Sequence, residues 1–151
     1  MVERMESAVE RVHIITLGVE DINKSLHFYR DGLGFSTTAA ESDPPIVFFQ
    51  SQGVILALYP KVGLAEDIDK RNPPVGEGFS NITLGHVVSE KEEVDRILSL
   101  AEKAGGSIVK SAQMAFWGGY HGYFTDIDGY HWEVMYWENW HFKEDGSLFI
   151  E

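Results

Sequence analysis

The tetrapeptide Ile-Thr-Leu-Gly occurs twice in this chain, at residues 15–18 and again at residues 82–85. The copies stand in the stretches "IITLGVED" (14–21) and "NITLGHVV" (81–88). A four-residue match is weak evidence alone, but an internal repeat decides how a whole fold is read. In both places the repeat is followed by a helical pattern and then by two β-rich runs. We therefore predict that the chain consists of two similar modules.

The first copy leads into "EDINKSLHFYRDGLGF" (20–35), which has the pattern of an amphipathic helix. Asp21 precedes the apolar residues and can accept hydrogen bonds from the backbone N–H groups of the first turn. Gly32 and Gly34 predict the end of the helix. The predicted buried face consists of residues that recur near the helical period: Ile22, Leu26, Tyr29 and Leu33.

The second copy leads into "SEKEEVDRILSLAEKAGGSI" (89–108), which also predicts a helix. Ser89 and Glu92 have the spacing of a capping box, in which each side chain bonds a backbone N–H that the helix leaves unpaired. The pair Gly105-Gly106 predicts the end. The predicted buried stripe is Val94, Ile97, Leu98 and Ala101.

Each half ends in a predicted hairpin, within "PIVFFQSQGVILALYPK" (45–61) and "GGYHGYFTDIDGYHWEVMYW" (118–137). A short turn that ends in glycine, Gly53 or Gly129, joins two β-rich runs in both. Aligning these glycines places Ala57 opposite Glu133. The sequence thus predicts an α+β fold of two βαβββ modules in one compact domain. The predicted division is module 1 at 11–61, a linker at 62–77, module 2 at 78–137 and a tail at 138–151.

The composition excludes several classes of function. The formal net charge is −12, so we expect neither nucleic acid nor an anionic membrane surface as a partner. The chain has no cysteine, which excludes disulfides and thiolate chemistry. No apolar run approaches the roughly 20 residues that span a bilayer, and residues 1–19 do not have the pattern of a signal peptide. We expect a cytoplasmic protein.

The motifs resemble those of the vicinal oxygen chelate superfamily, which includes glyoxalase I, the bleomycin resistance proteins and the extradiol dioxygenases. The resemblance is carried by "ITLGVEDINKSLHFYRDGLGF" (15–35) and "FTDIDGYHWEV" (124–134). The stretch "WGGYHGYFTDIDGYHWEV" (117–134) is similar to a glyoxalase-related bacterial subgroup whose members are mostly of unassigned function. The resemblance implies a curved mixed sheet around a cavity. It also implies four cavity positions that bind a divalent metal in the enzymes of the family.

Those four positions fall here at Ile14, Ala57, Asn81 and Glu133. Transition metals need several imidazole or carboxylate donors at once. Two aliphatic side chains and one amide do not meet that need. We therefore predict no metal and no other cofactor.

A divalent metal at a displaced site is the alternative, held by His121, His131 and Glu133. His131 and Glu133 are two residues apart in a predicted strand, so they share a face. His13 and His86 lie at odd offsets from the inherited positions and are expected to point away from the cavity. The competing interpretation is that both His121 and His131 are structural.

Glu133 is the candidate catalytic residue, because a carboxylate among bulky apolar neighbours must be hydrogen-bonded or change its pKa. It can act as a general base, anchor a ligand, or serve as a structural acceptor bonded to Asn81. Asp126 and Asp128 of the "DIDGY" turn are expected to bond local backbone N–H groups. The "WGGY" loop is expected either to cover the cavity or to pack in the core or a dimer contact. The predicted ligand-binding residues are Tyr59, Asn81, Trp117, Tyr120, His131 and Glu133.

Two functions follow from these observations. The favoured one is a metal-free binding protein that holds a small molecule between the modules. The alternative is an enzyme of the lyase, isomerase or dioxygenase type, which uses Glu133 as a base or the displaced metal. A homodimer is compatible with both functions.

Overall fold

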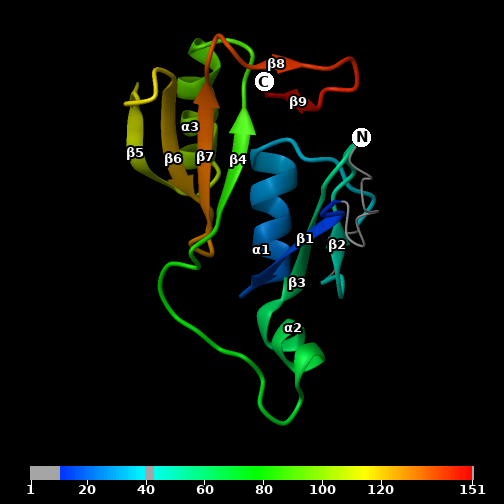
Figure 1. Ribbon diagram of the computed structural model, residues 1–151. Coiled ribbons are helices and arrows are strands. Elements are labelled where there is room, and N and C mark those ends of the chain that lie inside the picture. Colours follow the sequence, from blue (N-terminus) through cyan, green and yellow to red (C-terminus); the bar gives the residue numbers. More distant parts are fainter. Residues whose placement is uncertain (1–10, 40–42, 151) are drawn as a thin grey trace, which may run out of the picture.

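The computed structural model describes residues 11–39 and 43–150, and Figure 1 shows the arrangement of their helices and strands. The elements of the first module are β1 (Ile14–Val19), α1 (Ile22–Leu26), the π-helical turn η1 (His27–Gly32), β2 (Val47–Phe48), β3 (Ile55–Pro60) and α2 (Lys61–Ile68). Those of the second module are β4 (Thr83–Val87), α3 (Glu92–Lys103), β5 (Ser107–Met114), β6 (Tyr120–Thr125) and β7 (His131–Tyr136), followed by β8 (His141–Phe142) and β9 (Leu148–Phe149).

Both modules place their first strand beside their last strand. The strand order is β1-β3-β2 in one sheet and β4-β7-β6-β5 in the other. The pairs β1–β3 and β4–β7 are parallel, whereas the hairpins β2–β3 and β6–β7 are antiparallel. In the first module, the counterpart of β5 is reduced, in the described part of the chain, to a bridge between Ser36 and Gln50. The predicted α+β fold of two βαβββ-like modules is confirmed.

The first predicted cap is confirmed and the second is wrong. The side chain of Asp21 accepts a hydrogen bond from the backbone N–H of Lys24 at 3.1 Å. In contrast, α3 begins at Glu92 with Lys91 at its N-cap and no side-chain cap, so Ser89 lies too early to form a capping box. The first turn of α3 instead carries Glu92, Glu93 and Asp95, whose charges favour the positive end of the helix dipole.

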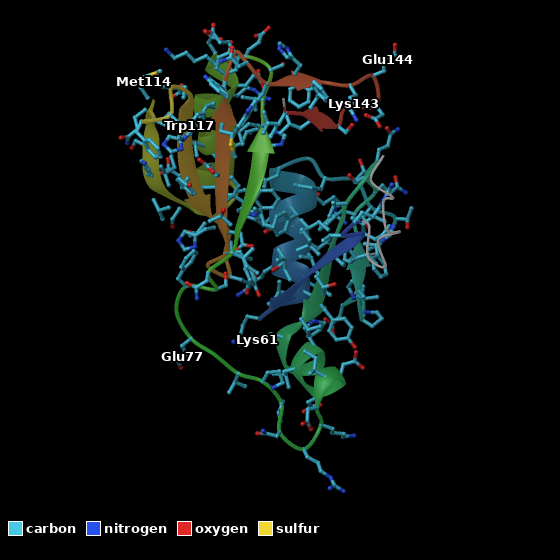
Figure 2. The ribbon with its side chains drawn as sticks, viewed as in Figure 1. Lys61, Glu77, Met114, Trp117, Lys143 and Glu144 are labelled. Carbon is cyan, nitrogen blue, oxygen red and sulfur yellow. The ribbon has the colours of Figure 1, made fainter. Side chains whose placement is uncertain are left out.

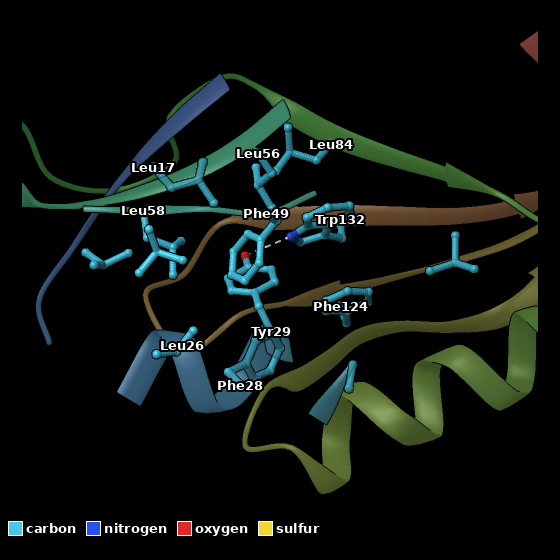
Figure 3. Packing of buried hydrophobic residues seen from close by; sticks show 14 of the residues in the cluster. Leu17, Leu26, Phe28, Tyr29, Phe49, Leu56, Leu58, Leu84, Phe124 and Trp132 are labelled. Carbon is cyan, nitrogen blue, oxygen red and sulfur yellow. Dashed lines mark hydrogen bonds between the residues drawn. The ribbon is translucent and has the colours of Figure 1, made fainter. Parts of the chain in front are cut away.

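The two modules share one hydrophobic core, shown in Figure 3. Its centre is aromatic. Tyr29 packs against Phe49 and Trp132, and Trp132 stacks on Phe124. The indole N–H of Trp132 donates to the hydroxyl of Tyr29 at 3.2 Å, so the polar tips of both buried rings are satisfied. Aromatic side chains therefore fill the centre of the contact between the modules.

The "DIDGY" turn joins the modules through a buried carboxylate. One oxygen of Asp126 accepts the backbone N–H groups of Asp128 (2.9 Å) and Tyr130 (2.8 Å), as expected for a local turn. The other oxygen accepts from the hydroxyl of Tyr29 in the first module. Burial raises the pKa of Asp126, and burial followed by the nearby Asp126 charge raises the pKa of Tyr29 well above its ordinary value. The turn therefore also bonds the second module to the first.

Asp128 and Tyr130 add further links to the first module. The carboxylate of Asp128 accepts from the hydroxyl of Ser25 at 2.8 Å and from the backbone N–H of Glu20 at 2.9 Å. The hydroxyl of Tyr130 donates to the carbonyl of Gly18 at 2.7 Å. The expectation that Asp128 bonds only local backbone is wrong, because the turn packs directly against the start of α1.

Two elements were not expected from the sequence. The first eight residues after β3 form α2, although 62–77 reads as a linker rich in Pro, Gly and acids. None of its side chains is buried, so its residues show no apolar stripe that would predict a helix. The tail contains the short hairpin of β8 and β9. In the described ranges 11–39 and 43–150, no helix is long and apolar enough to cross a membrane.

Candidate functional site

The four-stranded sheet has one face against α3 and one face turned away from it, which we call the outer face. A side chain at Gly122 would meet Leu98 of α3, so even-numbered positions of β6 face the helix. Side chains alternate along each strand, so the odd-numbered positions of β6 point away from the helix. The residues of β7 and β4 in register with them point the same way. The outer face consists of Thr83, Gly85 and Val87 from β4, His131, Glu133 and Met135 from β7, and His121, Tyr123 and Thr125 from β6.

The pairing registers correct the alignment of the modules. Gly85 of the second repeat lies opposite Glu133, and Gly18 of the first repeat lies opposite Tyr59. Ala57 lies opposite Thr16 instead. The match of Ala57 to Glu133 is therefore off by two residues, because the connection between β2 and β3 is longer than that between β6 and β7. A shift of two keeps the same face.

His121 and Glu133 form the centre of the outer face. Nδ1 of His121 lies 2.7 Å from Oε2 of Glu133, and His121 is only 5% exposed. An ionised carboxylate can only accept, so Nδ1 carries the proton in this pair. When the imidazole is neutral, its Nε2 is then an unprotonated acceptor. The pair orients one free nitrogen on the outer face.

Two imidazole nitrogens in this region have no partner. Nε2 of His121 and Nδ1 of His131 are buried without a hydrogen bond. Leaving a buried polar atom unpaired costs about 1–3 kcal/mol, so such atoms need an explanation. They lie on opposite sides of Glu133, since His121 pairs with Met135 whereas His131 is four residues earlier in β7. The outer face can therefore offer hydrogen-bonding nitrogens at two separate places.

Aromatic rings surround these groups. Trp117 contacts the His121 ring edge to face at a centroid distance of 5.7 Å, and Tyr123 contacts it at 5.6 Å. Phe79 packs edge to face on His131 at 5.0 Å. Burial, and then the charge of Glu133 and a hydrogen bond to it, raise the pKa of Tyr123. The site combines apolar walls with few polar anchors, as small-molecule sites do.

Three of the residues predicted to bind a ligand lie elsewhere. Asn81 precedes β4, is exposed and has a positive φ of 64°, so it is not a strand residue that faces Glu133. Tyr120 lies on the α3 side of β6, where its hydroxyl donates to Asp95 at 3.0 Å. Tyr59 belongs to β3 in the other sheet. The expected bond between Asn81 and Glu133 is replaced by the bond from His121.

His131 and Glu133 share the outer face of β7, and the ring of Trp117 packs on His121 at the other end of that strand. Figure 2 shows Trp117 at the same end of the four-stranded sheet as Met114. Sequence reasoning considered His121 only as part of a displaced metal site. Once residues 120–125 are assigned to a strand, alternation places His121 on the face opposite Tyr120 and on the same face as Tyr123. That pattern is the signal in the sequence that His121 belongs to the outer face. His86 lies on the α3 side of β4, as expected, because it pairs with Val134.

The residues at the inherited metal positions do not fit a metal. Ile14 and Ala57 offer no donor, and Tyr59, which the register matches to Glu133 in place of Ala57, offers only a phenol hydroxyl. Asn81 lies outside the strand, and the carboxylate of Glu133 is engaged by His121. In the described part of the chain, no three His, Cys, Asp or Glu side chains are grouped so that they could hold a metal ion. Along β7, at roughly 3.3 Å per residue, His131 and the residue that pairs with His121 are about 13 Å apart. The two histidines are therefore too far apart to form the displaced metal site.

A second hollow lies beside the linker. It has a volume of about 1080 Å³ and lies between α2, residues 73–80 and the 128–130 turn. Three of the polar side chains that line it have partners within the protein: Lys61 pairs with Glu20 at 2.5 Å, and Asp128 and Tyr130 bond the first module. The outer face, in contrast, has unpaired nitrogens. We therefore take the outer face as the candidate functional site.

Comparison with known proteins agrees with this architecture. The family model described as the glyoxalase/bleomycin resistance protein/dioxygenase superfamily matches residues 11–134. A glyoxalase-related enzyme from Fulvimarina pelagi is 31% identical, with a TM-score of 0.84, over 94% of this chain and 99% of that one. No curated protein matches the chain.

Two further structures share the fold. A glyoxalase/bleomycin resistance protein/dioxygenase from Nocardioides is 22% identical, with a TM-score of 0.69, over 87% of this chain and 86% of that one. A protein of unknown function from Agrobacterium tumefaciens is 24% identical, with a TM-score of 0.67, over 87% of this chain and 97% of that one. With two βαβββ-like modules and a family match over most of its length, the chain belongs to the glyoxalase/bleomycin resistance protein/dioxygenase superfamily.

Proposed function

We propose that this protein binds a small molecule on the outer face of its four-stranded sheet, without a metal. The observation that carries the proposal is the buried, unpaired Nε2 of His121, oriented by the hydrogen bond from Nδ1 to Glu133. A ligand that donates a hydrogen bond would relieve the cost of that unpaired atom. Glu133 and His121 are the proposed anchors, Tyr123 is the proposed wall beside them, and Trp117 covers the imidazole.

A second candidate function is acid–base catalysis. The arrangement favours His121 as the base and Glu133 as the residue that positions it, because the carboxylate fixes the tautomer and leaves Nε2 free to take a proton. The substrate would carry an acidic C–H, O–H or N–H group. Glu133 then acts through His121 and does not itself accept the proton.

A ligand screen tests the binding proposal. Soluble metabolite-sized compounds are screened by tryptophan fluorescence and thermal shift against the metal-free protein. Each hit is then measured against His121→Asn, with His141→Asn as the matched control, because His141 is exposed in β8. We expect hits to lose at least about 10-fold in affinity in the first variant, the equivalent of one hydrogen bond. Hits that bind both variants equally place the site elsewhere.

Deuterium exchange separates the two functions. The protein is incubated with pooled carbonyl compounds in deuterated buffer, and loss of C–H signals is followed by NMR. Exchange that depends on His121 would support a proton-transferring enzyme. Binding without any exchange would support a binding protein.

We also propose that the chain forms a homodimer through the three-stranded sheet. The support is the apolar character of its side facing away from the core, where Ile14 and Phe48 are each 48% exposed. Phe48→Glu should shift the mass measured by light scattering toward the monomer. An unchanged mass in that variant would contradict this interface.

A further inference from the structure

Trp117 packs edge to face on the imidazole of His121, whose Nε2 is buried and unpaired. Its ring is half-buried and meets the imidazole at an interplanar angle of 82°. The far side of the same indole stacks on Trp140 at 5.6 Å and 19°, and Trp137 meets it edge to face at 6.0 Å. We call the position of this indole, in contact with His121, Trp137 and Trp140, the slot.

The indole of Trp117 cannot itself satisfy that nitrogen in this arrangement. It has a single donor, its ring N–H, and Nε2 of His121 nevertheless has no hydrogen-bond partner in the structure. The indole therefore occupies the slot but leaves Nε2 of His121 unpaired. A ring with a correctly placed donor would fit the same space and make one more bond.

The loop that carries Trp117 is closed by its own backbone hydrogen bonds, which do not involve the indole. Ala115 donates its N–H to the carbonyl of Gly119 at 2.7 Å, and Gly118 donates to the carbonyl of Ala115 at 3.1 Å, so the backbone turn is closed. Gly118 has a φ of 101°, a conformation that glycine adopts without strain. The indole lies over Gly119, where an added Cβ would come within 1.8 Å of the ring. The ring position therefore depends on the missing side chain at Gly119.

We propose that Trp117 is a displaceable cover, and that the ligand is a planar aromatic molecule with a hydroxyl or N–H donor at its edge. The ligand takes the place of the indole against Trp140 and donates its hydrogen bond to Nε2 of His121. The carboxylate of Glu133 beside the imidazole disfavours an anionic group at that edge, so the donor is neutral or cationic. This inference rests on the proposed binding function and names its ligand class.

A pair of matched probes tests the proposal. 4-Nitrophenol, at a pH where it is protonated, has a planar ring and an O–H donor. 4-Nitroanisole has the same ring but a methoxy group that cannot donate. Binding of both is measured by fluorescence quenching and by equilibrium dialysis with wild type, Trp117→Ala, Gly119→Ala and His121→Phe. Phe116→Ala is the control, because Phe116 is a fully exposed aromatic residue of the same loop.

Removing the cover should strengthen binding. We expect Trp117→Ala to bind 4-nitrophenol at least about 10-fold more tightly than wild type, because the indole no longer competes for the slot. Gly119→Ala should act in the same direction while keeping all four tryptophans, which guards against a variant that does not fold. The preference for 4-nitrophenol over 4-nitroanisole should also be about 10-fold and should disappear in His121→Phe.

The other outcomes overturn different parts of the proposal. Equal binding by wild type and both cover variants, with a preference that still depends on His121, would refute the cover and leave the binding function intact. Equal binding of both probes by every form would refute the donor assignment. If no folded form binds either probe, both the ligand class and the site at His121 are wrong, even if the compound screen finds a ligand elsewhere on the protein.

Discussion

The carboxylate of Asp128 accepts a hydrogen bond from the hydroxyl of Ser25 at 2.8 Å, between residues 103 positions apart in the sequence. Ser25 is fully buried in α1, and Asp128 belongs to the turn before β7. The bond therefore fixes how the first helix lies against the second module. Together with the Tyr29–Asp126 bond, it holds the two modules in the arrangement that turns His121 and Glu133 outward.

The Ser25–Asp128 bond should appear as coupling in a double-mutant cycle. Ser25→Ala and Asp128→Ala are expected to destabilise the fold by about 1–3 kcal/mol each, because both remove a partner from a group withdrawn from water. The coupling energy should fall within about 0.5–3 kcal/mol, measured by urea unfolding. Ser147→Ala is the control, because its hydroxyl bonds the exposed Asp145 within one turn. Strictly additive effects would show that the bond contributes nothing.

Alkaline pH should destabilise the protein through Tyr29. Its folded-state pKa lies well above the ordinary value, first because of burial and then because of the Asp126 charge. The unfolded chain loses this proton at about pH 10, while the folded chain keeps it, so the unfolded state binds fewer protons above that pH. Stability is therefore fully present below about pH 10 and is lost as the pH rises through the folded-state pKa.

Tyr29→Phe tests that assignment. The variant should lose stability at neutral pH, because Asp126 and Trp132 lose their partner, but its stability should fall less steeply above about pH 10. Tyr59→Phe is the matched control, because in the described part of the chain the hydroxyl of this half-buried β3 residue makes no hydrogen bond. Denaturant titrations between neutral and alkaline pH give both slopes. Parallel slopes for wild type and Tyr29→Phe would exclude Tyr29 as the source.

Glu133→Gln should weaken ligand binding more than it weakens the fold. The amide oxygen of glutamine can still accept from Nδ1 of His121, so the stability loss should be about 1 kcal/mol. A ligand anchored through this pair should lose about 10–100-fold in affinity, because a charge-assisted bond becomes a neutral one. Glu138→Gln, at an exposed position after β7, should change neither.

Kinetics of the same variant would distinguish a catalytic role. If the protein transfers protons, loss of the charge at Glu133 should lower turnover by about 10²–10⁴-fold while binding persists. A variant that melts, binds and turns over like wild type would remove Glu133 from the site.

Metal binding should be weak. Protein purified without an affinity tag and treated with a mild chelator should retain less than one equivalent of Zn, Ni, Fe or Mn in elemental analysis. The physical reason is the donor set, in which Ile14, Ala57 and Asn81 offer no charged ligand. Calorimetric titration with Zn²⁺ provides a second measurement. One tightly held equivalent that disappears in His121→Asn would contradict the expectation and indicate a metal at the outer face.

The two-module fold could be predicted from the sequence alone. The repeated tetrapeptide, the apolar stripes of α1 and α3 and the glycine turns before β3 and β7 are local patterns, and local patterns carry helix and strand identity. Gly53 and Gly129 have the positive φ values that such turns require, 98° and 87°. Glu133 could be identified as a candidate from the sequence, because a single carboxylate in an otherwise apolar strand is recognisable without knowledge of its partner.

The residues that contact Glu133 could not be predicted from the sequence. Its partner depends on strand register, and a register is set by loop lengths and by long-range packing that no local pattern records. The pairing of β6 with β7 brings His121 to Glu133 and turns Tyr120 toward α3, whereas the left-handed backbone at Asn81 removes that residue from β4. The position of the site was decided in the same way. Tyr29, Phe49 and Trp132 fill the centre of the contact between the modules, and the unpaired nitrogens of His121 and His131 lie on the outer face.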